Sequence, residues 1–276
     1  MSKKILVPTD FTNVGDTAIS HAIKIATTIG SEVHVMHVVG KKEAAADAKI
    51  KLQFLKERVK EEKGFDIETI LRIGTIFEDV VDYSVEIDAT LIVMGTHGKR
   101  AMQFLSGTRA LKIVTDSKVP FIIVQEKDID ENGYDRIVVP FDLHKNTKQK
   151  LKVASSMAKY FNSKVYVVSP SEKDEFLSKQ LTQNLNYAKK YFTDRDINIE
   201  IKVLATKNSG FVAELIDFSQ EVEADLISIM NFHEGSLMSF FGGSYEEKVI
   251  TNKHHIPVLC LNPMDLFKSS GGVFST

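Results

Sequence analysis

The sequence predicts an α/β protein with two tandem copies of a Rossmann-like, doubly wound, five-stranded parallel sheet. An internal repeat at a constant spacing of 132 residues relates Ile5, Val7, Pro8 and Asp10 to Ile137, Val139, Pro140 and Asp142. Short apolar segments also alternate with longer segments of helical period, as in parallel sheets that helices cover on both faces. The length of 276 residues suits two domains of ordinary size.

The elements of the first copy follow in order along the chain. Strands are expected at 5–7, 33–38, 67–71, 91–94 and 121–124. Helices are expected up to Gly30, at 41–63, at 76–87, and after a glycine-rich loop to about 116. Asp10 or Thr12 is expected to cap the first helix. Gly30 ends that helix, and its counterpart Asn162 is the other residue type that accepts a left-handed position.

The repeat also sets the expected domain boundaries. One domain is expected over residues 1–127 and a second over 135–264, with a polar linker at 125–134 that has no apolar period. Five strands of this kind fit the order 3-2-1-4-5, which reverses between the first and fourth strands. Ligands bind such sheets at the carboxyl ends of the strands beside the reversal. Those ends carry residues 8–10 and 95–98, so topology and glycine placement indicate one site.

Composition argues against several classes of function. With 35 basic and 37 acidic residues, the net charge is −2, which gives no sign of a nucleic-acid-binding surface. No stretch approaches the roughly 18 apolar residues of a membrane span, and the first apolar run is too short for a signal peptide. The single cysteine, Cys260, lies in an apolar run and is expected in the core of a reduced, cytoplasmic protein.

The glycine-rich loop of the first copy is the strongest chemical signal. Gly95, Gly98 and Gly107 follow a strand and lead into a helix, where glycine lets backbone amides approach a phosphate. A hydroxyl and positive charges stand nearby, on Thr108, Lys99, Arg100 and Arg109. A tight turn without a ligand is the alternative that the glycines alone leave open.

With these motifs, the chain resembles a tandem member of the universal stress protein family. The resemblance rests on three separated segments in the family's order: residues 5–10, His37-Val38, and residues 91–98 with Gly107-Thr108. It covers both copies. The family's nucleotide-binding branch has nine residues between the last two motif glycines, whereas this chain has eight, residues 99–106.

The resemblance implies a site in the first copy for ATP or AMP, with or without Mg²⁺. Pro8 and Asp10 would lie against the nucleoside, and Val38 would contact adenine through its backbone. The ribose and phosphates would be wrapped by Gly95, Thr96, His97, Gly98, Lys99, Arg100 and Ala101. The phosphates would be held after Gly107, by Thr108, Arg109 and Ala110. Asp10 is an equally good helix cap, and one residue can do both.

The second copy departs from the motif. Depending on the alignment, Asn231 or Met230 replaces the first glycine and Glu234 or His233 the second, while Gly243-Ser244 persists. Either alignment puts side chains where phosphate oxygens would lie, which favours a site that has lost its ligand. The family also implies that the two copies pack as a pseudo-twofold pair through their fifth strands, and that two chains form a homodimer. Pairing would remove exposed apolar edge strands.

We therefore expect an adenine-nucleotide-binding regulatory protein of the stress response, with an unidentified protein partner and at most weak ATP hydrolysis. No catalytic or metal residue is assigned. His97 has no evident acidic partner and is expected to touch the ligand rather than act as a base. A metal site at His254-His255 is disfavoured, because adjacent residues of an extended chain point apart.

The sequence bears differently on three rival functions. An adaptor that binds no nucleotide stays open because of the shortened motif and the degenerate second copy. An adenylate-transferring ligase is disfavoured, because the first strand is followed by Pro-Thr-Asp-Phe-Thr and not by Ser-Gly-Gly-x-Asp-Ser. A dinucleotide site is disfavoured, because no glycine fingerprint follows the first strand.

Overall fold

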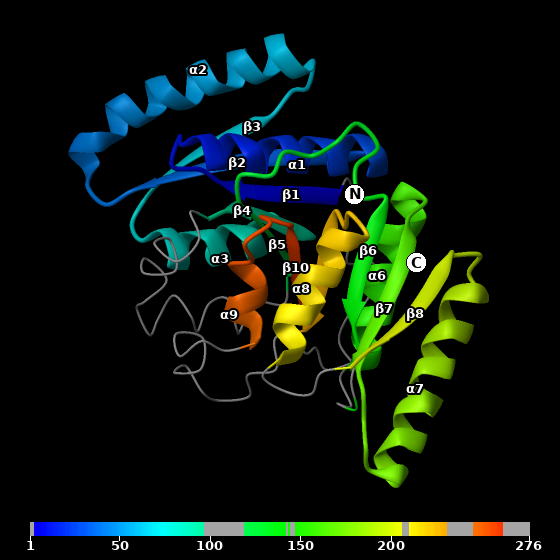
Figure 1. Cartoon of the computed structure of the whole chain (residues 1–276). Helices are drawn as coiled ribbons and strands as arrows, with labels where there is room; N and C mark the ends of the chain where they lie inside the picture. Colours follow the sequence, from blue (N-terminus) through cyan, green and yellow to red (C-terminus); the bar gives the residue numbers. More distant parts are fainter. Residues whose placement is uncertain are drawn as a thin grey trace. The chain divides into compact units, whose positions relative to one another are not determined.

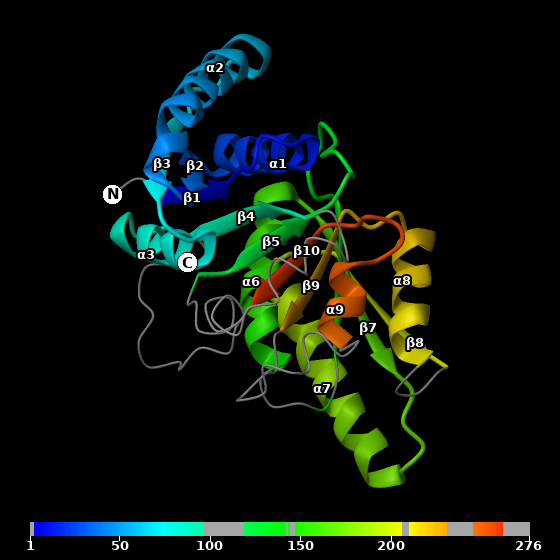
Figure 2. The ribbon, with the colours of Figure 1, turned by 90° about the vertical axis from the view of Figure 1, so that its left-hand side faces the viewer.

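The computed structural model describes residues 3–96, 119–141, 143, 147–205, 210–230 and 245–261. Figure 1 shows the ribbon, and Figure 2 shows it turned by 90°. The described chain divides into two compact units, and the boundary between them along the sequence lies between Ile129 and Asp130. The domain bounds expected from the repeat, and the packing of the two units as a pseudo-twofold pair, stay predictions.

The first unit alternates strands and helices. Its described elements are β1 (Lys3–Pro8), α1 (Asn13–Ile29), β2 (Ser31–Val39), the 3-10 turn η1 (Lys42–Ala44), α2 (Ala45–Lys63), β3 (Glu68–Ile73), α3 (Ile76–Glu86), β4 (Leu91–Gly95) and β5 (Phe121–Val124). The strands pair in parallel in the order β3-β2-β1-β4-β5. This confirms the predicted order and its reversal between β1 and β4. The helix expected at 41–63 begins at Ala45, because η1 takes up the preceding residues.

The second unit repeats this plan. Its described elements are β6 (Arg136–Pro140), α6 (Thr147–Phe161), β7 (Lys164–Pro170), α7 (Glu175–Thr193), β8 (Ile199–Leu204), α8 (Phe211–Glu221), β9 (Leu226–Met230), α9 (Tyr245–Ile250) and β10 (Val258–Leu261). Its strands pair in parallel in the order β10-β9-β6-β7-β8. The amide of Phe141 donates to the Val168 carbonyl at 2.7 Å, as the amide of Thr9 does to Met36 at 2.8 Å.

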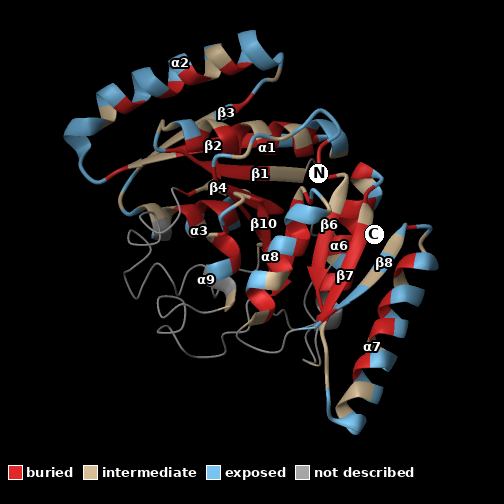
Figure 3. Ribbon diagram, viewed as in Figure 1, coloured by how far each residue is buried: buried red, intermediate tan, exposed pale blue. Residues whose placement is uncertain are grey.

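The central strands of each unit are buried on both faces, as their uninterrupted apolar runs predict (Figure 3). Ile5, Leu6 and Val7 of β1 have no exposed surface. The helix ends also follow the sequence: Gly30 has φ 67° and Asn162 has φ 54°. Both residues accept the left-handed conformation that ends a helix, so the predicted correspondence between them is confirmed.

Helices lie on both faces of the first sheet. An ion pair of 2.7 Å joins Arg58 of α2 to Asp16 of α1, which lie on one face. On the other face, α3 places the Tyr83 hydroxyl 3.2 Å from the Nδ1 atom of His34 on β2. Successive side chains of β2 point to opposite faces of the sheet. One set therefore faces α1 and α2, and the other set faces α3.

Candidate functional site

Three of the residues that the sequence assigned to the site reach one face of the first sheet. β1 pairs in parallel with both β2 and β4, and its last residue, Pro8, lies opposite Met36. Register is constant along parallel strands, so Val38 on β2 and Thr96, just after β4, lie at one level, two residues beyond Pro8. Because side chains alternate between faces, Pro8, Val38 and Thr96 share the face that α3 covers.

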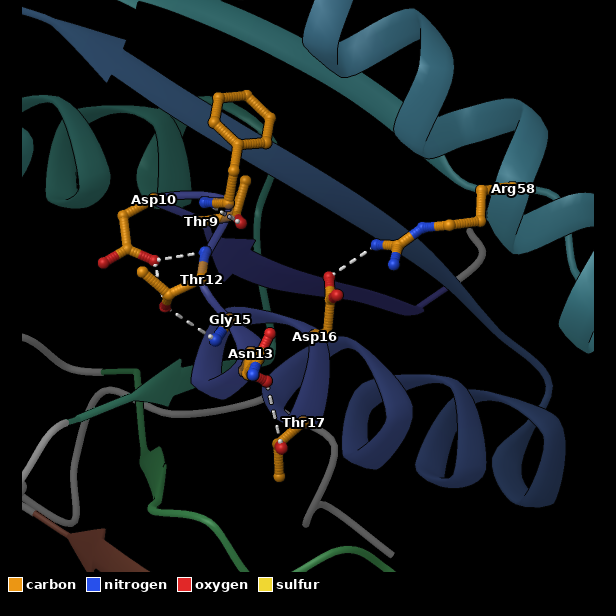
Figure 4. Close-up of polar contacts among 9 residues, drawn as sticks. Thr9, Asp10, Thr12, Asn13, Gly15, Asp16, Thr17 and Arg58 are labelled. Carbon is orange, nitrogen blue, oxygen red and sulfur yellow. Dashed lines mark hydrogen bonds and ion pairs between the residues drawn. The ribbon is translucent and has the colours of Figure 1, made fainter.

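The loop after β1 is held by its own side chains (Figure 4). Thr12 is the helix cap, since its hydroxyl accepts from the Gly15 amide at 3.3 Å. Asp10 braces the cap: its Oδ1 atom accepts from the Thr12 amide at 3.1 Å and from the Thr12 hydroxyl at 2.5 Å. Of the two caps that the sequence left open, the structure selects Thr12. Asp10 is exposed, and both of these bonds go to its Oδ1 atom.

The same loop contains a backbone conformation that the sequence did not reveal. Phe11 has φ 62°, which a residue with a branched or bulky side chain rarely adopts. Its amide donates to the Thr9 hydroxyl at 3.1 Å, and its ring lies 4.4 Å from that of His37. His37 in turn contacts the Thr9 carbonyl oxygen through Nδ1 at 2.7 Å, which ties the loop to β2. These contacts keep Asp10 at the carboxyl end of β1.

Gly95, on the opposite face from Thr96, packs against helix α1. A Cβ at this position would lie 2.6 Å from the Val14 carbonyl oxygen and 2.8 Å from its Cγ1 atom. Glycine is therefore required here by the close approach of α1. The family resemblance assigns Gly95 to the ligand loop, and the packing gives it a separate, structural reason to be glycine.

Thr96 has a buried hydroxyl that makes no hydrogen bond to the described residues. The residue is 4% exposed, and its Oγ1 atom has no partner in the part of the chain that the structure describes. Its backbone is fixed, because the Thr96 amide donates to the Val124 carbonyl at 2.8 Å. A buried hydroxyl without a protein partner is unusual in a folded chain and indicates a group that water or a ligand satisfies.

One ion pair adds to the electrostatics near the loop. Asp16 lies in the first turn of α1, where a negative charge favours the positive end of the helix dipole. It accepts a hydrogen bond from Arg58, and this bond raises the pKa of the Arg58 guanidinium. Partial burial of the guanidinium acts in the opposite direction but is the smaller effect. Both groups are about one-third exposed, so the pair adds little to stability.

The remaining predicted ligand residues lie outside the described part of the chain. They are His97, Gly98, Lys99, Arg100, Ala101, Gly107, Thr108, Arg109 and Ala110. The described part of the site therefore consists of the ends of β1, β2 and β4, with Pro8, Asp10, Val38, Gly95 and Thr96.

The equivalent edge of the second unit carries different side chains. The register sets Ile137 opposite Leu226, as Ile5 lies opposite Leu91, so Met230 is the equivalent of Gly95. This decides between the two alignments that the sequence left open. The fully buried Phe141 replaces Thr9, and Pro170 replaces Val38.

Two of these replacements remove features that a ligand would use. Proline has no backbone amide, so Pro170 offers one donor fewer than Val38. The side chain of Met230 stands where the first unit has only a hydrogen. Lys150 takes the place of Ala18 on the following helix, and its ammonium donates to the Pro140 carbonyl.

His34, His254 and His255, which are among the described histidines, are held by the fold. His34 is buried in the first unit, where its Nδ1 atom contacts the Tyr83 hydroxyl and its Nε2 atom lies 3.4 Å from the Glu32 carboxylate. His254-His255 was expected in extended chain, and this is wrong: the pair lies in a turn that the His255 amide closes on the Asn252 carbonyl at 3.1 Å, and His255 has φ 54°. The turn forms because Asn252 bonds the amides of His254 and Ile256.

An open parallel sheet whose order reverses beside polar loops is the architecture of α/β ligand-binding folds. A family model described as the universal stress protein family matches residues 1–125. A universal stress protein of Methanocaldococcus jannaschii is 30% identical over 140 residues, covering 45% of this chain and 82% of the relative. A second universal stress protein from that organism is 25% identical over 159 residues, which cover 46% of this chain and 98% of the relative. The chain belongs to the universal stress protein family.

Solved structures extend the likeness of fold to both units. A universal stress protein from Archaeoglobus fulgidus has a TM-score of 0.74 at 20% identity, over 96% of this chain and 98% of that one. A Pseudomonas aeruginosa protein has a TM-score of 0.66 at 15% identity, over 95% of this chain and 94% of that one. Among the described helices, none has the length and apolar character needed to cross a membrane.

Proposed function

We propose that this chain is a regulatory protein of the stress response that binds one adenine nucleotide, ATP or AMP, in its first unit. The observation that carries the proposal is the meeting of the Asp10 loop with Gly95 and Thr96 at the reversal between β1 and β4. Ligands bind parallel sheets at such a reversal. The residues brought there are among those that the family resemblance assigns to the nucleotide: Asp10 to the nucleoside, and Gly95 and Thr96 to the ribose and phosphates.

The described residues fit a nucleoside in chemical terms. The loop is held in place before any ligand arrives, which lowers the entropy cost of binding. The exposed Asp10 carboxylate and the Thr96 hydroxyl are groups that can hydrogen-bond a sugar or a base. Membership of the family, together with these groups, supports a nucleotide over an unrelated ligand.

The second unit supports a stoichiometry of one. Phe141, Pro170 and Met230 occupy the positions of Thr9, Val38 and Gly95, and each replaces a small or hydrogen-bonding group. A chain with one competent and one degenerate unit suits regulation, in which nucleotide binding biases the contact with another protein. No described group stands as a general base, so hydrolysis would be slow.

The experiment is calorimetric titration of the purified protein with ATP and AMP, with and without Mg²⁺, after mass spectrometry of any small molecule that co-purifies. We expect about one adenine nucleotide per chain. Asp10→Asn keeps the Oδ1 acceptor for Thr12 but removes the negative charge, and should weaken binding while stability changes little. Asp142→Asn is the matched control in the second unit and should bind as the wild type does.

The outcomes separate the proposal from its rival. Two equivalent sites per chain, or a loss of binding in the Asp142 variant alone, would contradict a site in the first unit. Absence of binding by the wild-type protein, with no nucleotide released on denaturation, would favour the nucleotide-independent adaptor.

A further inference from the structure

Helix α2 carries apolar side chains on two faces (Figure 3). Its inner row is buried and consists of Ala48, Leu52, Leu55 and Val59. Its outer row consists of Ala46, Ile50 and Phe54, which follow at a spacing of four residues and so form one ridge of the helix. Ile50 is 70% exposed and Phe54 is 66% exposed. Two large apolar side chains side by side on a solvent-facing ridge indicate a surface that another molecule covers.

The equivalent helix of the second unit, α7, is an internal reference for this ridge. Its buried row consists of Leu181, Leu185, Ala188 and Phe192, at the same spacing as the buried row of α2. In the places of Ala46, Ile50 and Phe54, α7 therefore has Lys179, Gln183 and Tyr187. Its outer ridge is polar apart from the Tyr187 ring. Since both helices have the same place in the fold, the fold itself does not require an apolar outer ridge on α2.

The outer ridge of α2 fits a second copy of itself in size. When two α2 helices run antiparallel about a two-fold axis at Ile50, the Phe54 ring of each chain meets the small Ala46 of the other. Ridges with this spacing of four residues pack in the commonest class of helix crossing, at about −50°. The same patch then serves both chains, as a two-fold dimer requires.

The charges at the two ends of α2 also suit an antiparallel pair. Four cations of the helix are neutralised within the chain, in the ion pairs Lys51–Asp47, Lys56–Glu68, Arg58–Asp16 and Lys60–Asp66. Near the amino end, three further lysines and one glutamate leave a charge of +2: Lys41, Lys42, Lys49 and Glu43. Near the carboxyl end, one further lysine and three glutamates leave −2: Lys63, Glu57, Glu61 and Glu62. An antiparallel pair sets each positive end beside a negative one, which the helix dipoles also favour.

We propose that the chain forms a reversible homodimer through the outer ridge of α2, packed antiparallel against α2 of a second copy. The interface uses a helix and not the fifth strands, and it does not depend on nucleotide. One helix from each chain covers less than the roughly 1,200 Å² at the lower end of standard interfaces, so the dimer is weak. We expect a Kd of about 10–100 μM.

Sedimentation velocity of the full-length chain without nucleotide, from tenfold below to tenfold above this Kd, tests the proposal. Ile50→Gln gives α2 the residue type that α7 has at the equivalent position. It should weaken dimerisation at least tenfold, because it puts a polar side chain at the centre of the contact. Tyr187→Gln is the matched control on α7 and should dimerise as the wild type does. Both side chains are exposed, so both variants should melt with the wild type at concentrations below the Kd.

Salt gives a second measure of the same contact. Raising the ionic strength should weaken the dimer, because it screens the attraction between the oppositely charged helix ends. Stronger association at high salt would overturn the antiparallel pairing. A wild type that stays monomeric over the whole range would overturn the proposal and leave the ridge to a different protein. A dimer that Ile50→Gln leaves intact would also overturn it, because association would then use another surface.

Discussion

Val14 and Gly95 lie so close that a single added carbon would not fit between them. The Cβ of an alanine at position 95 would come within 2.6 Å of the Val14 carbonyl oxygen, which is backbone and cannot rotate away. The start of α1 and the end of β4 are thereby held together. Because the Asp10–Thr12 loop leads directly into α1, this contact also positions the β1 side of the candidate site.

Gly95→Ala should therefore destabilise the first unit by about 1–3 kcal/mol, the usual cost of overpacking. Binding of ATP should weaken as well, because α1 must move and carry the loop with it. Gly40→Ala is the control, since a Cβ there meets nothing within 4 Å. Denaturant titrations of the two variants check this, and equal midpoints would show that α1 adjusts at no cost.

Thr12→Ala should remove the cap of α1 and cost about 1 kcal/mol of stability. The Thr12 hydroxyl is the acceptor for the Gly15 amide and the donor to Asp10, so the loop also loses its brace. Thr28→Ala, near the other end of the same helix, removes only a bond to the Lys24 carbonyl and should be nearly neutral. Thermal melts compare the pair. A larger loss in the Thr28 variant would show that Thr12 is not the effective cap.

Gly98→Val, in the part of the motif outside the described residues, should abolish nucleotide binding and leave the fold intact. A branched side chain would occupy the space where the backbone is expected to meet phosphate. With ATP at a hundredfold excess over Kd, binding should stabilise the wild type by about 2.7 kcal/mol. A thermal shift assay should then show a rise of several degrees in the wild type only. The same rise in both proteins would move the site away from this loop.

Acid should weaken the first unit through His21. Burial lowers the pKa of His21 to about 4, although its contact with the Lys127 carbonyl at 3.0 Å partly opposes this. The unfolded chain therefore takes up a proton below about pH 6.5 that the folded chain resists down to about pH 4. Stability is full above pH 6.5 and falls as the pH drops through this window, by about 2 kcal/mol at pH 5.

His21→Gln separates this effect from general acid unfolding. The variant cannot gain a proton at this position, so its stability should depend less on pH between 6.5 and 4. Denaturant unfolding of both proteins at pH 7 and pH 5 gives the comparison. Parallel losses of stability would show that other groups cause the acid sensitivity.

Much of the fold could be predicted because its determinants are local. Apolar runs such as Ile5–Leu6–Val7 indicate strands buried on two faces, and Gly30 and Asn162 mark the ends of equivalent helices. The strand order followed from the number and spacing of these elements. The same local signals placed Pro8, Asp10 and Val38 at strand ends, and so near one another.

Other features depend on contacts between distant segments, and sequence periodicity does not encode these. The choice between Met230 and Asn231 as the equivalent of Gly95 required the pairing of β6 with β9. The left-handed Phe11 is held by the Thr9 hydroxyl and by a tilted ring contact with His37 on another strand.

The sequence alone determined that this protein has two doubly wound units and that the first carries the better-preserved glycine motif. Tertiary structure decided that Thr12, not Asp10, caps α1, and that Gly95 is required by α1. It also decided that the Thr96 hydroxyl is buried with no partner among the described residues. The physical reason is that secondary structure and chain reversal follow from neighbouring residues. Burial and hydrogen bonding of a single side chain depend instead on which remote segments pack around it.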